Sequence, residues 1–380
     1  MQIQFNYRYL LDESEYESHQ YQFTQCKDKL IAYHLDEVGS VIQFAEMHQH
    51  QGSYVALYLP YEAAPFFNEQ MATIQIQGEY VFAAAYVFDK KEDITLTDKK
   101  DQYIPKCDFK FQLNKSQLIT HIKAVQSAII EGNTYQVNYT TRLTDDIHYP
   151  IATLYEVLQQ QNHGFYSALI DTDEVQLASL SPELFFQRGP FENRKDVLLS
   201  KPMKGTIARG HSETQDQQNL HTLMNSVKDK AENVMIVDLL RNDISRITET
   251  GTVKVYKPFH IERYSTVFQM TSMVTGALHQ ETKLMHILKA LFPCGSITGA
   301  PKINTMKYIK KLEQTPRNGY CGTVALLLPE GKSIFNVPIR TIQYMDNQAI
   351  YGVGAGITID SKPEDEVQEF KDKTKILERL

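Results

Sequence analysis

The sequence is poor in cysteine, and the few cysteines that it has form no recognisable group. Cys26, Cys107, Cys294 and Cys321 are scattered along the 380 residues without a CxxC pair. A disulfide framework and a thiolate zinc site are therefore not expected. We interpret the thiols as buried or incidental groups in a reducing cytosol, and we predict a cytoplasmic protein.

Long apolar runs and an excess of basic residues are also missing. No apolar run approaches the roughly 18 residues that a bilayer span needs, and residues 1–20 lack a basic segment followed by an apolar core. Neither a membrane association nor a signal peptide is expected. The formal net charge is −7, from 39 basic and 46 acidic residues. Because phosphate binding normally leaves a basic footprint, nucleic acid is not expected as a partner.

The sequence does contain a mixture of strand-like and helix-like segments. Short aromatic or β-branched segments predict strands, and apolar residues near helical spacing predict helices. The predicted strands include 52–67, 80–89, 135–143, 164–171 and 174–179, and the predicted helices 111–133, 151–161, 228–247, 283–291 and 301–313. Hairpin turns are predicted at 329–332 and 346–347, and a last helix that begins with a capping box at 361–364. Strands in hairpin runs without strict βαβ alternation favour an α+β fold.

The stretch KPMKGTIARG at 201–210 suits neither a helix nor a central strand. It holds three cations, two glycines and one proline. Taken alone, it leaves two interpretations of Lys204 open. The residue is either a charge on a surface turn or a reactive amine held in a site.

The glycine-rich stretch PCGSITGAPK at 293–302 resembles a phosphate loop only superficially. That motif requires glycine directly before the lysine and a hydroxyl residue after it, whereas here Pro301 precedes Lys302 and Ile303 follows. The stretch is interpreted as a turn that exposes backbone N–H groups at a helix start, which is a possible anion cradle. An ordinary tight turn before a helix explains it equally well.

Acidic residues on two predicted helices raise the question of a metal site. Glu366, Glu369 and Lys373 fall on one face of the closing helix, where a Glu369–Lys373 surface ion pair is the simpler interpretation. A hard cation such as Mg2+ needs one or two carboxylates together with water or substrate oxygens. Glu232, on a partly apolar face of the 228–247 helix, is a candidate partner, or else only the rim of that face.

Two further charged residues stand in apolar surroundings. Arg340 lies in a strand-like segment, where it is either paired structurally or available to bind a carboxylate in bidentate fashion. Glu183 precedes an apolar run, and partial burial there would raise its pKa enough for acid catalysis. None of these residues is decisive alone.

In combination, these segments resemble the chorismate-utilising enzymes. The resemblance is carried, in order, by SPELF (181–185), PMKGTIARG (202–210), DLLRNDISRI (238–247), PCGSITGAPK (293–302), RNGYCGTV (317–324), IRT (339–341) and GAGITIDSKPEDE (354–366). It implies two large antiparallel sheets packed as a sandwich and flanked by helices, with the active site in the cleft between them. Residues 1–105 are then expected to contribute strands to this common fold, and 106–380 to form the chorismate-binding catalytic region of one integrated domain. The resemblance also implies that Mg2+ binds the ring carboxylate of chorismate.

Motif by motif, the resemblance implies roles for individual residues. Glu232 and Glu366 are implied as metal ligands, with Glu369 as a further acid at the metal. The residues implied to bind the substrate are Thr298 beside the ring carboxylate, Lys373 near the same group, Tyr320 and Arg340 at the enolpyruvyl carboxylate, and the backbone of Gly354 and Gly356.

The residue before Gly205-Thr206 selects a subgroup within the family. Anthranilate synthases typically have alanine there, whereas aminodeoxychorismate synthases have lysine, as this chain does with Lys204. The resemblance implies that this amine attacks C2 of the ring while the C4 hydroxyl departs, that ammonia then attacks C4, and that Glu183 protonates the departing hydroxyl. Isochorismate synthases carry a water-activating lysine where Gln136 stands, so that reaction is not favoured.

One residue departs from the family pattern. Gln269 stands where a histidine that assists the leaving group is usual, and a carboxamide cannot donate a proton as an acid near pH 7. The closest subgroup is that of aminodeoxychorismate synthase component I, on the route to 4-aminobenzoate and folate. No Cys–His–Glu glutaminase signature is recognised, so ammonia is expected from a separate glutamine amidotransferase subunit. The alternatives are an anthranilate synthase component I and a non-catalytic chorismate-binding module.

Overall fold

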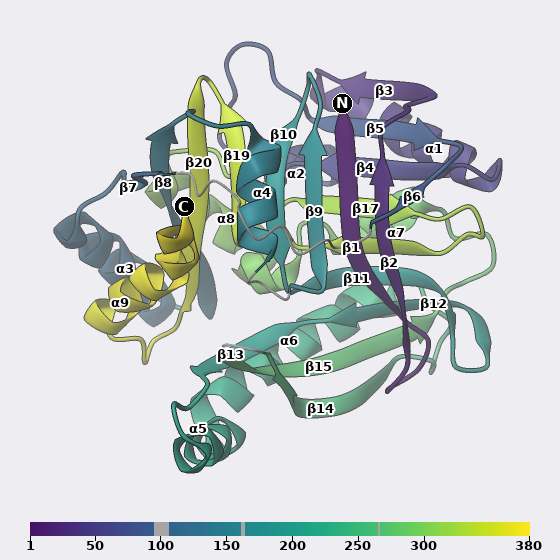
Figure 1. Ribbon diagram of the computed structural model, residues 1–380. Helices are drawn as coiled ribbons and strands as arrows, with labels where there is room; N and C mark the ends of the chain where they lie inside the picture. Colours follow the sequence, from purple (N-terminus) through teal and green to yellow (C-terminus); the bar gives the residue numbers. More distant parts are fainter. Residues whose placement is uncertain (95–105, 161–163, 265–266) are drawn as a thin grey trace.

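A computed structural model describes residues 1–94, 106–160, 164–264 and 267–380. Their strands form two large antiparallel sheets, and helices cover the outer faces of both (Figure 1). The expected α+β sandwich is therefore confirmed. Most of the charged connection expected at 89–102 lies outside the described residues.

The first sheet, called sheet A, contains ten of the described strands. Its order is β16-β8-β20-β19-β10-β9-β1-β2-β6, with β7 beside β8. The bounds are β1 (Gln2–Leu10), β2 (Tyr16–Phe23), β6 (Glu92–Asp93), β7 (Lys110–Phe111), β8 (Gln136–Asp146), β9 (Tyr166–Asp171), β10 (Gln176–Ser181), β16 (Gly299–Ala300), β19 (Thr341–Met345) and β20 (Gln348–Ile357).

The second sheet, called sheet B, also contains ten of the described strands. Its order is β13-β15-β12-β11-β18-β17-β4-β5-β3, with β14 beside β15. The bounds are β3 (Asp28–Ala32), β4 (Tyr54–Leu59), β5 (Ala83–Phe88), β11 (Leu184–Phe191), β12 (Arg194–Lys201), β13 (Met203–Ala208), β14 (Lys254–Arg263), β15 (Val267–Ala277), β17 (Thr323–Leu327) and β18 (Ser333–Asn336). Strands from residues 1–94 therefore join both sheets.

The apolar runs in the sequence are long because central strands are buried on both faces. In β4, Ala56 and Tyr58 lie in the aromatic core between the sheets, whereas Val55 and Leu57 face the helices outside. Successive side chains of a strand point to opposite faces, so both alternating sets must be apolar. The inner core is rich in rings, and the centroids of Phe5 and Tyr7 lie 5.0 Å apart in an edge-to-face pair.

Helices cover the outside of each sheet. The helices that share an apolar core with sheet B are α1 (Val38–His50), α2 (Ala64–Phe67), α6 (Val227–Ser245) and α7 (Leu284–Leu291). The helix α8 (Lys302–Glu313) packs against β8 and β16 of sheet A. Sheet A is covered by α3 (Lys115–Ile130), α4 (Ile151–Gln159) and α9 (Pro363–Thr374), and Figure 1 shows α4 in front of its strands. The more exposed α5 (Glu213–Asn225) packs near β13 and β15. None of the helices among the described residues is long and apolar enough to cross a membrane.

Three local predictions were wrong or incomplete. The strand predicted over 52–67 ends at Leu59, because Pro60 has no N–H to continue the ladder, and short helical turns follow. The predicted capping box of α9 is absent: Lys362 is the N-cap, and the Ser361 hydroxyl instead accepts a hydrogen bond from the amide of Thr358 at 3.1 Å. The helices α1 and α5 were not predicted. The prediction missed the apolar stripe of α1 at Val38, Val41, Ile42 and Ala45, whereas α5 is polar and buries Leu223 alone.

Candidate active site

Lys204 lies in a β-bulge on β13, the edge strand of sheet B. Met203 pairs with Thr271 and Thr206 pairs with Gln269, so Lys204 and Gly205 together face one residue of β15. Gly205 has φ of +88°, a conformation that favours glycine, and a Cβ there would lie 2.9 Å from Cβ of Asp229 on α6. Bulges redirect a side chain next to active sites. Residues Lys204-Gly205-Thr206 therefore form a bulge in an edge strand and not a surface turn.

The amine of Lys204 lies where the two sheets approach each other. Its Nζ donates to the carbonyl oxygen of Ser296 at 3.3 Å. A Cβ added to Gly356 on β20 would lie 3.3 Å from this Nζ and 2.0 Å from Nε2 of Gln136 on β8. The missing side chain at Gly356 therefore leaves room for both groups. Oε1 of Gln136 is buried and has no hydrogen-bond partner within the described chain.

Glu183 is a buried carboxyl between β10 and β11. Its side chain accepts a hydrogen bond from the Ser296 hydroxyl, with Oγ and Oε1 2.7 Å apart. Burial raises the pKa of Glu183 to about 7, against the opposing effects of the Ser296 hydrogen bond and of the Lys204 and Lys373 charges. The carboxyl therefore changes protonation near neutral pH, as a general acid must.

Ser296 joins the two predicted catalytic residues, and sequence reasoning missed it. Its hydroxyl contacts Glu183 while its carbonyl contacts Lys204. The same turn, η3 (Gly295–Ile297), precedes Thr298, whose hydroxyl donates to the Cys294 carbonyl at 3.0 Å and stabilises the turn. The glycine-rich motif drew attention to this turn, but nothing in the sequence singled out the serine.

Two of the predicted metal ligands come together from different helices. Nζ of Lys228 lies 3.9 Å from Oε1 of Glu232 on α6 and 3.8 Å from Oε1 of Glu366 on α9. Burial raises the pKa of both carboxyls. An ammonium between two carboxylate oxygens occupies the kind of position that a hard divalent cation takes. The pair therefore fits Mg2+.

Glu369, the third acid predicted at the metal, is engaged elsewhere. It forms an ion pair with Lys373 at 2.7 Å, as the simpler interpretation of the α9 spacing has it. Within the part of the chain that the structure describes, no group of three or more His, Cys, Asp or Glu side chains is arranged to hold a metal ion. Any Mg2+ here would need further oxygens from water or substrate.

Two further predicted site residues, Lys373 and Tyr320, lie against the backbone of glycines in β20. The Lys373 amine donates to the Gly354 carbonyl at 2.6 Å. The ring of Tyr320 lies against Gly352, where a Cβ would approach a ring carbon to 2.4 Å. Burial raises the pKa of the Tyr320 hydroxyl well above its usual value, so this group remains a hydrogen-bond donor.

Arg340 is placed to receive an anion. It has φ of +53°, which is uncommon for a residue with a side chain, and its carbonyl accepts from the Leu180 amide at 3.1 Å. Burial lowers the pKa of the guanidinium. No carboxylate of the described residues forms an ion pair with it. A partly buried guanidinium without a counter-ion suits an incoming carboxylate.

A buried charge network behind the site was also missed. Nη2 of Arg317 pairs with Glu313 at 2.6 Å, and Arg142 reaches the same carboxylate at 3.3 Å. Arg317 also donates to the carbonyls of Ile297 and Asn138 at 2.6 and 2.7 Å. Asn138 lies opposite Gly356 in the β8–β20 ladder. The network therefore holds the backbone on both sides of the site, and the i,i+4 spacing of Glu313 and Arg317 was its only signal.

Other prominent cations are engaged in structural pairs. Lys201 pairs with Glu262, and Arg209 binds Asp216 at 2.7 Å. Nζ of Lys302 contacts Asp243 at 3.2 Å and the Leu291 carbonyl at 2.9 Å. Lys302 therefore does not serve the glycine-rich turn as a phosphate-binding lysine would.

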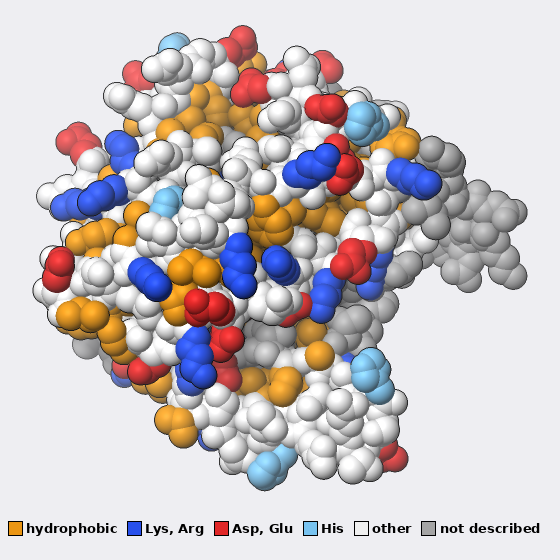
Figure 2. Space-filling model, turned by 90° about the vertical axis from the view of Figure 1, so that its left-hand side faces the viewer, with side chains coloured by type: hydrophobic (Ala, Val, Ile, Leu, Met, Phe, Trp, Pro, Cys, Tyr) orange, Lys and Arg blue, Asp and Glu red, His pale blue; other side chains and the backbone are white. Residues whose placement is uncertain are grey.

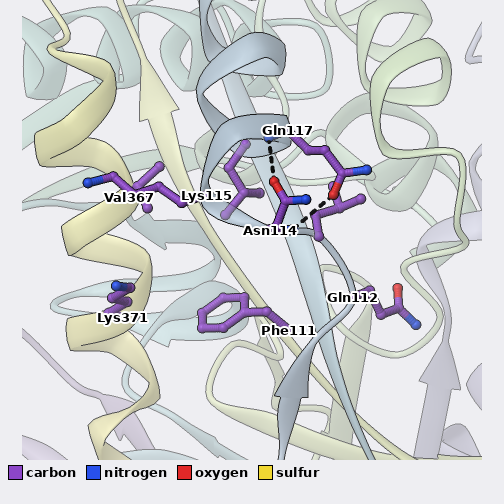
Figure 3. A pocket seen from close by; sticks show the side chains of 9 residues that line it. Phe111, Gln112, Asn114, Lys115, Gln117, Val367 and Lys371 are labelled. Carbon is purple, nitrogen blue, oxygen red and sulfur yellow. Dashed lines mark hydrogen bonds between the residues drawn. The ribbon is translucent and has the colours of Figure 1, made fainter.

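Charged side chains of both signs lie on the side of the molecule drawn in Figure 2. They are interspersed next to a hollow in the surface. A separate groove of about 430 Å3 lies between α3 and α9, where Asn114 and Gln117 cap the start of α3 (Figure 3). Its lining includes Lys115 and Lys371 but none of the predicted site residues.

Sequence comparisons place the chain among known proteins. The protein family described as chorismate binding enzyme matches residues 7–379. Aminodeoxychorismate synthase component 1 of Escherichia coli (strain K12) is 35% identical over 294 residues, which cover 77% of this chain and 62% of that protein. Anthranilate synthase component 1 of Aquifex aeolicus (strain VF5) is 34% identical over 272 residues, covering 71% of this chain and 54% of the relative. The chain thus spans between half and two thirds of the length of these curated relatives.

Solved structures share the fold. Anthranilate synthase component I from Streptococcus pneumoniae TIGR4 superposes with a TM-score of 0.77 at 21% identity, covering 98% of this chain and 89% of that one. The menaquinone-specific isochorismate synthase MenF of Escherichia coli gives 0.75 at 17% identity, covering 100% and 88%. At these identities the likeness concerns the architecture alone.

Proposed function

Because the chain belongs to the family of chorismate binding enzymes, we propose that it converts chorismate and ammonia to 4-amino-4-deoxychorismate and water. The observation that carries the proposal is the Lys204 amine, held in a bulge and linked through Ser296 to the Glu183 carboxyl. A nucleophile and a proton donor that share one hydrogen-bonded neighbour are suited to a displacement in which a hydroxyl leaves.

In the first step the Lys204 amine forms a bond to ring C2. The two ring double bonds each shift by one position, and the C4–O bond breaks. Glu183 gives its proton to the departing hydroxyl, which leaves as water, and then accepts the proton that the new secondary ammonium loses. The lysine adduct therefore forms with no other co-reactant.

In the second step ammonia attacks C4. The double bonds shift back, and the bond between C2 and Nζ of Lys204 breaks. The proton released by the new C4 ammonium passes through Glu183 to the departing amine. Two successive displacements retain the configuration at C4.

The electrostatic interaction between Lys204 and Glu183 links their protonation. The positive charge of Lys204 opposes the rise in the pKa of Glu183. When the amine is neutral, as attack requires, this opposition is lost and the carboxyl holds its proton more tightly. A neutral nucleophile and a protonated acid therefore favour each other, which is the combination that the first step needs.

Other residues would hold the two carboxylates of chorismate. Arg340 and Tyr320 are proposed to bind the enolpyruvyl carboxylate, since one is a cation without an ion-pair partner among the described residues and the other a hydroxyl donor. The Thr298 turn, Lys373 and the backbone of Gly354 and Gly356 are proposed to surround the ring. Glu232 and Glu366 would hold Mg2+, with Glu369 nearby. When bound, the metal would neutralise the ring carboxylate.

The ammonia is proposed to come from a separate glutamine amidotransferase. The "component 1" in the names of several relatives supports a multi-component enzyme. The product retains its enolpyruvyl group, so a distinct lyase would form 4-aminobenzoate for folate synthesis. We also propose a cytoplasmic location for this role.

Anthranilate synthase component I is the second candidate, because relatives of that name are 32% to 34% identical. Gln269 counts against it, since the side chain already binds the Gly205 carbonyl and the Thr206 hydroxyl and cannot act as an acid. A chorismate-binding module without catalysis is the remaining alternative.

One incubation separates these functions. The protein is mixed with chorismate, Mg2+ and ammonium, and the product is identified by mass; Lys204→Ala is treated in parallel. We expect aminodeoxychorismate from the wild type and none from the variant. A fluorescent aromatic product would favour anthranilate synthase, and chorismate binding without turnover would favour the binding module. Full amination by Lys204→Ala would overturn the covalent mechanism.

A further inference from the structure

The side chain of Gln269 closes the bulge that carries Lys204. Its Nε2 donates to the Gly205 carbonyl at 3.1 Å, and its Oε1 accepts from the Thr206 hydroxyl at 2.9 Å. Both bonds join β15 to β13 at the point where the register shifts. Gln269 is only 7% exposed, so water cannot readily replace these partners.

A bulge needs such a contact because it interrupts the ladder. The extra residue leaves backbone groups without their regular partners. The carboxamide of Gln269 supplies a donor to the Gly205 carbonyl and an acceptor for the next residue at the same time. A carboxamide can do both in one fixed orientation.

The bulge is also held from the opposite side. Gly205 packs against Asp229 on α6, with room for no side chain between them. Glu232, one of the two acids that fit a metal, lies one turn further along the same helix. The backbone that carries Lys204 is therefore fixed between β15 and the helix of the acidic pair.

We propose that Gln269 is a positioning residue that sets the direction of the Lys204 amine through the Gly205 carbonyl. This proposal rests on the proposed function for its consequence in catalysis. Gln269, which stands where the family usually has histidine, would then orient the backbone next to Lys204 and would not exchange a proton with the substrate.

The sharpest variant is Gln269→Glu, which keeps the shape and the acceptor for Thr206 but loses the donor to Gly205. Gln269→Ala loses both bonds. The matched control is Gln49 on α1, another buried glutamine, whose Nε2 donates to the Leu328 and Lys332 carbonyls at 3.0 and 2.9 Å. Gln49→Glu and Gln49→Ala remove equivalent bonds far from β13 in the sheet order.

The first measurement is the rate at which chorismate and Mg2+, without ammonia, form the Lys204 adduct, followed by intact mass. We expect both Gln269 variants to slow it by about 10- to 100-fold, because small misplacements of a reacting group have effects of that order. Chorismate affinity is expected to change by less than about threefold, since the anion-binding groups stay in place. In Gln269→Glu, the rate relative to wild type should recover as the pH falls from 8 to 6, because a protonated carboxyl regains the donor.

A second measurement does not depend on the reaction. Hydrogen–deuterium exchange of a peptide covering 203–208 should be faster in both Gln269 variants and unchanged in the Gln49 variants. Adduct rates within about threefold of wild type, or equal losses in the Gln49 variants, would overturn the positioning role. If the wild type itself forms neither adduct nor amino product, the proposed function fails, and unchanged exchange in the Gln269 variants would separately refute the closure of the bulge.

Discussion

Ser296 donates its hydroxyl hydrogen to Oε1 of Glu183 across 2.7 Å, and both residues are buried. The same serine presents its carbonyl to the Lys204 amine at 3.3 Å. A single residue of the glycine-rich turn thus contacts both the Glu183 carboxyl, in the connection from sheet A to sheet B, and the Lys204 amine on β13 of sheet B.

Ser296→Ala should raise the pKa of Glu183 further above about 7, because a hydrogen bond that favours the ionised form is lost. The fall in kcat at high pH, where the acid loses its proton, should move upward by about one pH unit, the size expected for a hydrogen bond to a charged group. A kcat profile measured from pH 6 to 9 gives the shift. Cys294→Ala is the control, since the Cys294 thiol contacts the same hydroxyl at 3.2 Å without touching Glu183. If the fall in kcat at high pH does not shift in Ser296→Ala, the identification of Glu183 as the acid is contradicted.

Glu183→Gln should abolish most turnover and yet stabilise the protein at alkaline pH. The folded-state pKa of Glu183, about 7, lies above its ordinary value of 4.5. The folded state therefore holds the proton more tightly, and this stability is present below about pH 4.5 and lost as the pH rises through 7. Glutamine does not titrate, so the variant does not lose this stability as the pH rises. Its free energy of unfolding relative to wild type should therefore rise by at most roughly 3 kcal/mol between pH 4.5 and pH 7. Urea unfolding at pH 5 and pH 8 tests this, with the exposed Glu79→Gln as control. A pH-independent difference would exclude Glu183 as the titrating group.

Lys228→Met should tighten Mg2+ binding. The Lys228 ammonium lies within 4 Å of both Glu232 and Glu366, so it competes with a cation for the same oxygens. Its side chain is 53% exposed, which limits such ion pairs to about 1 kcal/mol or less and the gain in affinity to about fivefold. Calorimetric titration with Mg2+ and the rise in Tm with added Mg2+ measure the effect. Lys230→Met, on the same helix, is the control. Equal or weaker binding by Lys228→Met would show that the two acids do not hold the metal.

Arg340→Ala should weaken the use of chorismate by removing the cation proposed for the enolpyruvyl carboxylate. Hydrogen bonds between charged groups contribute about 1.5–3 kcal/mol, so kcat/KM should fall about 10- to 100-fold, mainly through KM. Arg340→Lys should recover only part of this, because an ammonium lacks the planar fork. Steady-state kinetics provide the measurement. Arg241→Ala, which removes a surface arginine paired with Asp238 at 2.9 Å, serves as control. An unchanged KM in Arg340→Ala would place the carboxylate elsewhere.

Much of the local structure could be predicted from the sequence. The helix over 228–247 appears as α6 (Val227–Ser245), and the one over 283–291 appears as α7 (Leu284–Leu291). Helices are recognised from apolar residues three or four positions apart, so a short stretch of sequence is enough to predict them. The Glu369–Lys373 pair follows from the same spacing. The prediction failed at 60–67, where an apolar and aromatic composition suits a strand or a buried turn equally well.

The charged residues from which the site is proposed were also noticed in the sequence. Lys204, Glu183, Glu232 and Arg340 were each recognised as charges in unusual surroundings, and the motif order identified the family. What could not be predicted was the role of the residues between them. Arg317 and Gln269 donate to backbone carbonyls, and Ser296 accepts from Lys204 through its own carbonyl. Contacts of the backbone leave no pattern in the residue types.

The sequence by itself determined which charged groups are available, and it placed a glycine at 205, where the backbone can adopt the φ of +88° that the bulge requires. Only the tertiary structure decided that Lys204 of sheet B and Gln136 of sheet A both lie next to Gly356. It also decided that burial brings the pKa of Glu183 to about 7 and that Arg340 has no ion-pair partner among the described residues. These properties depend on how two sheets pack across long stretches of chain. Desolvation and opposed charges arise only once that packing is complete.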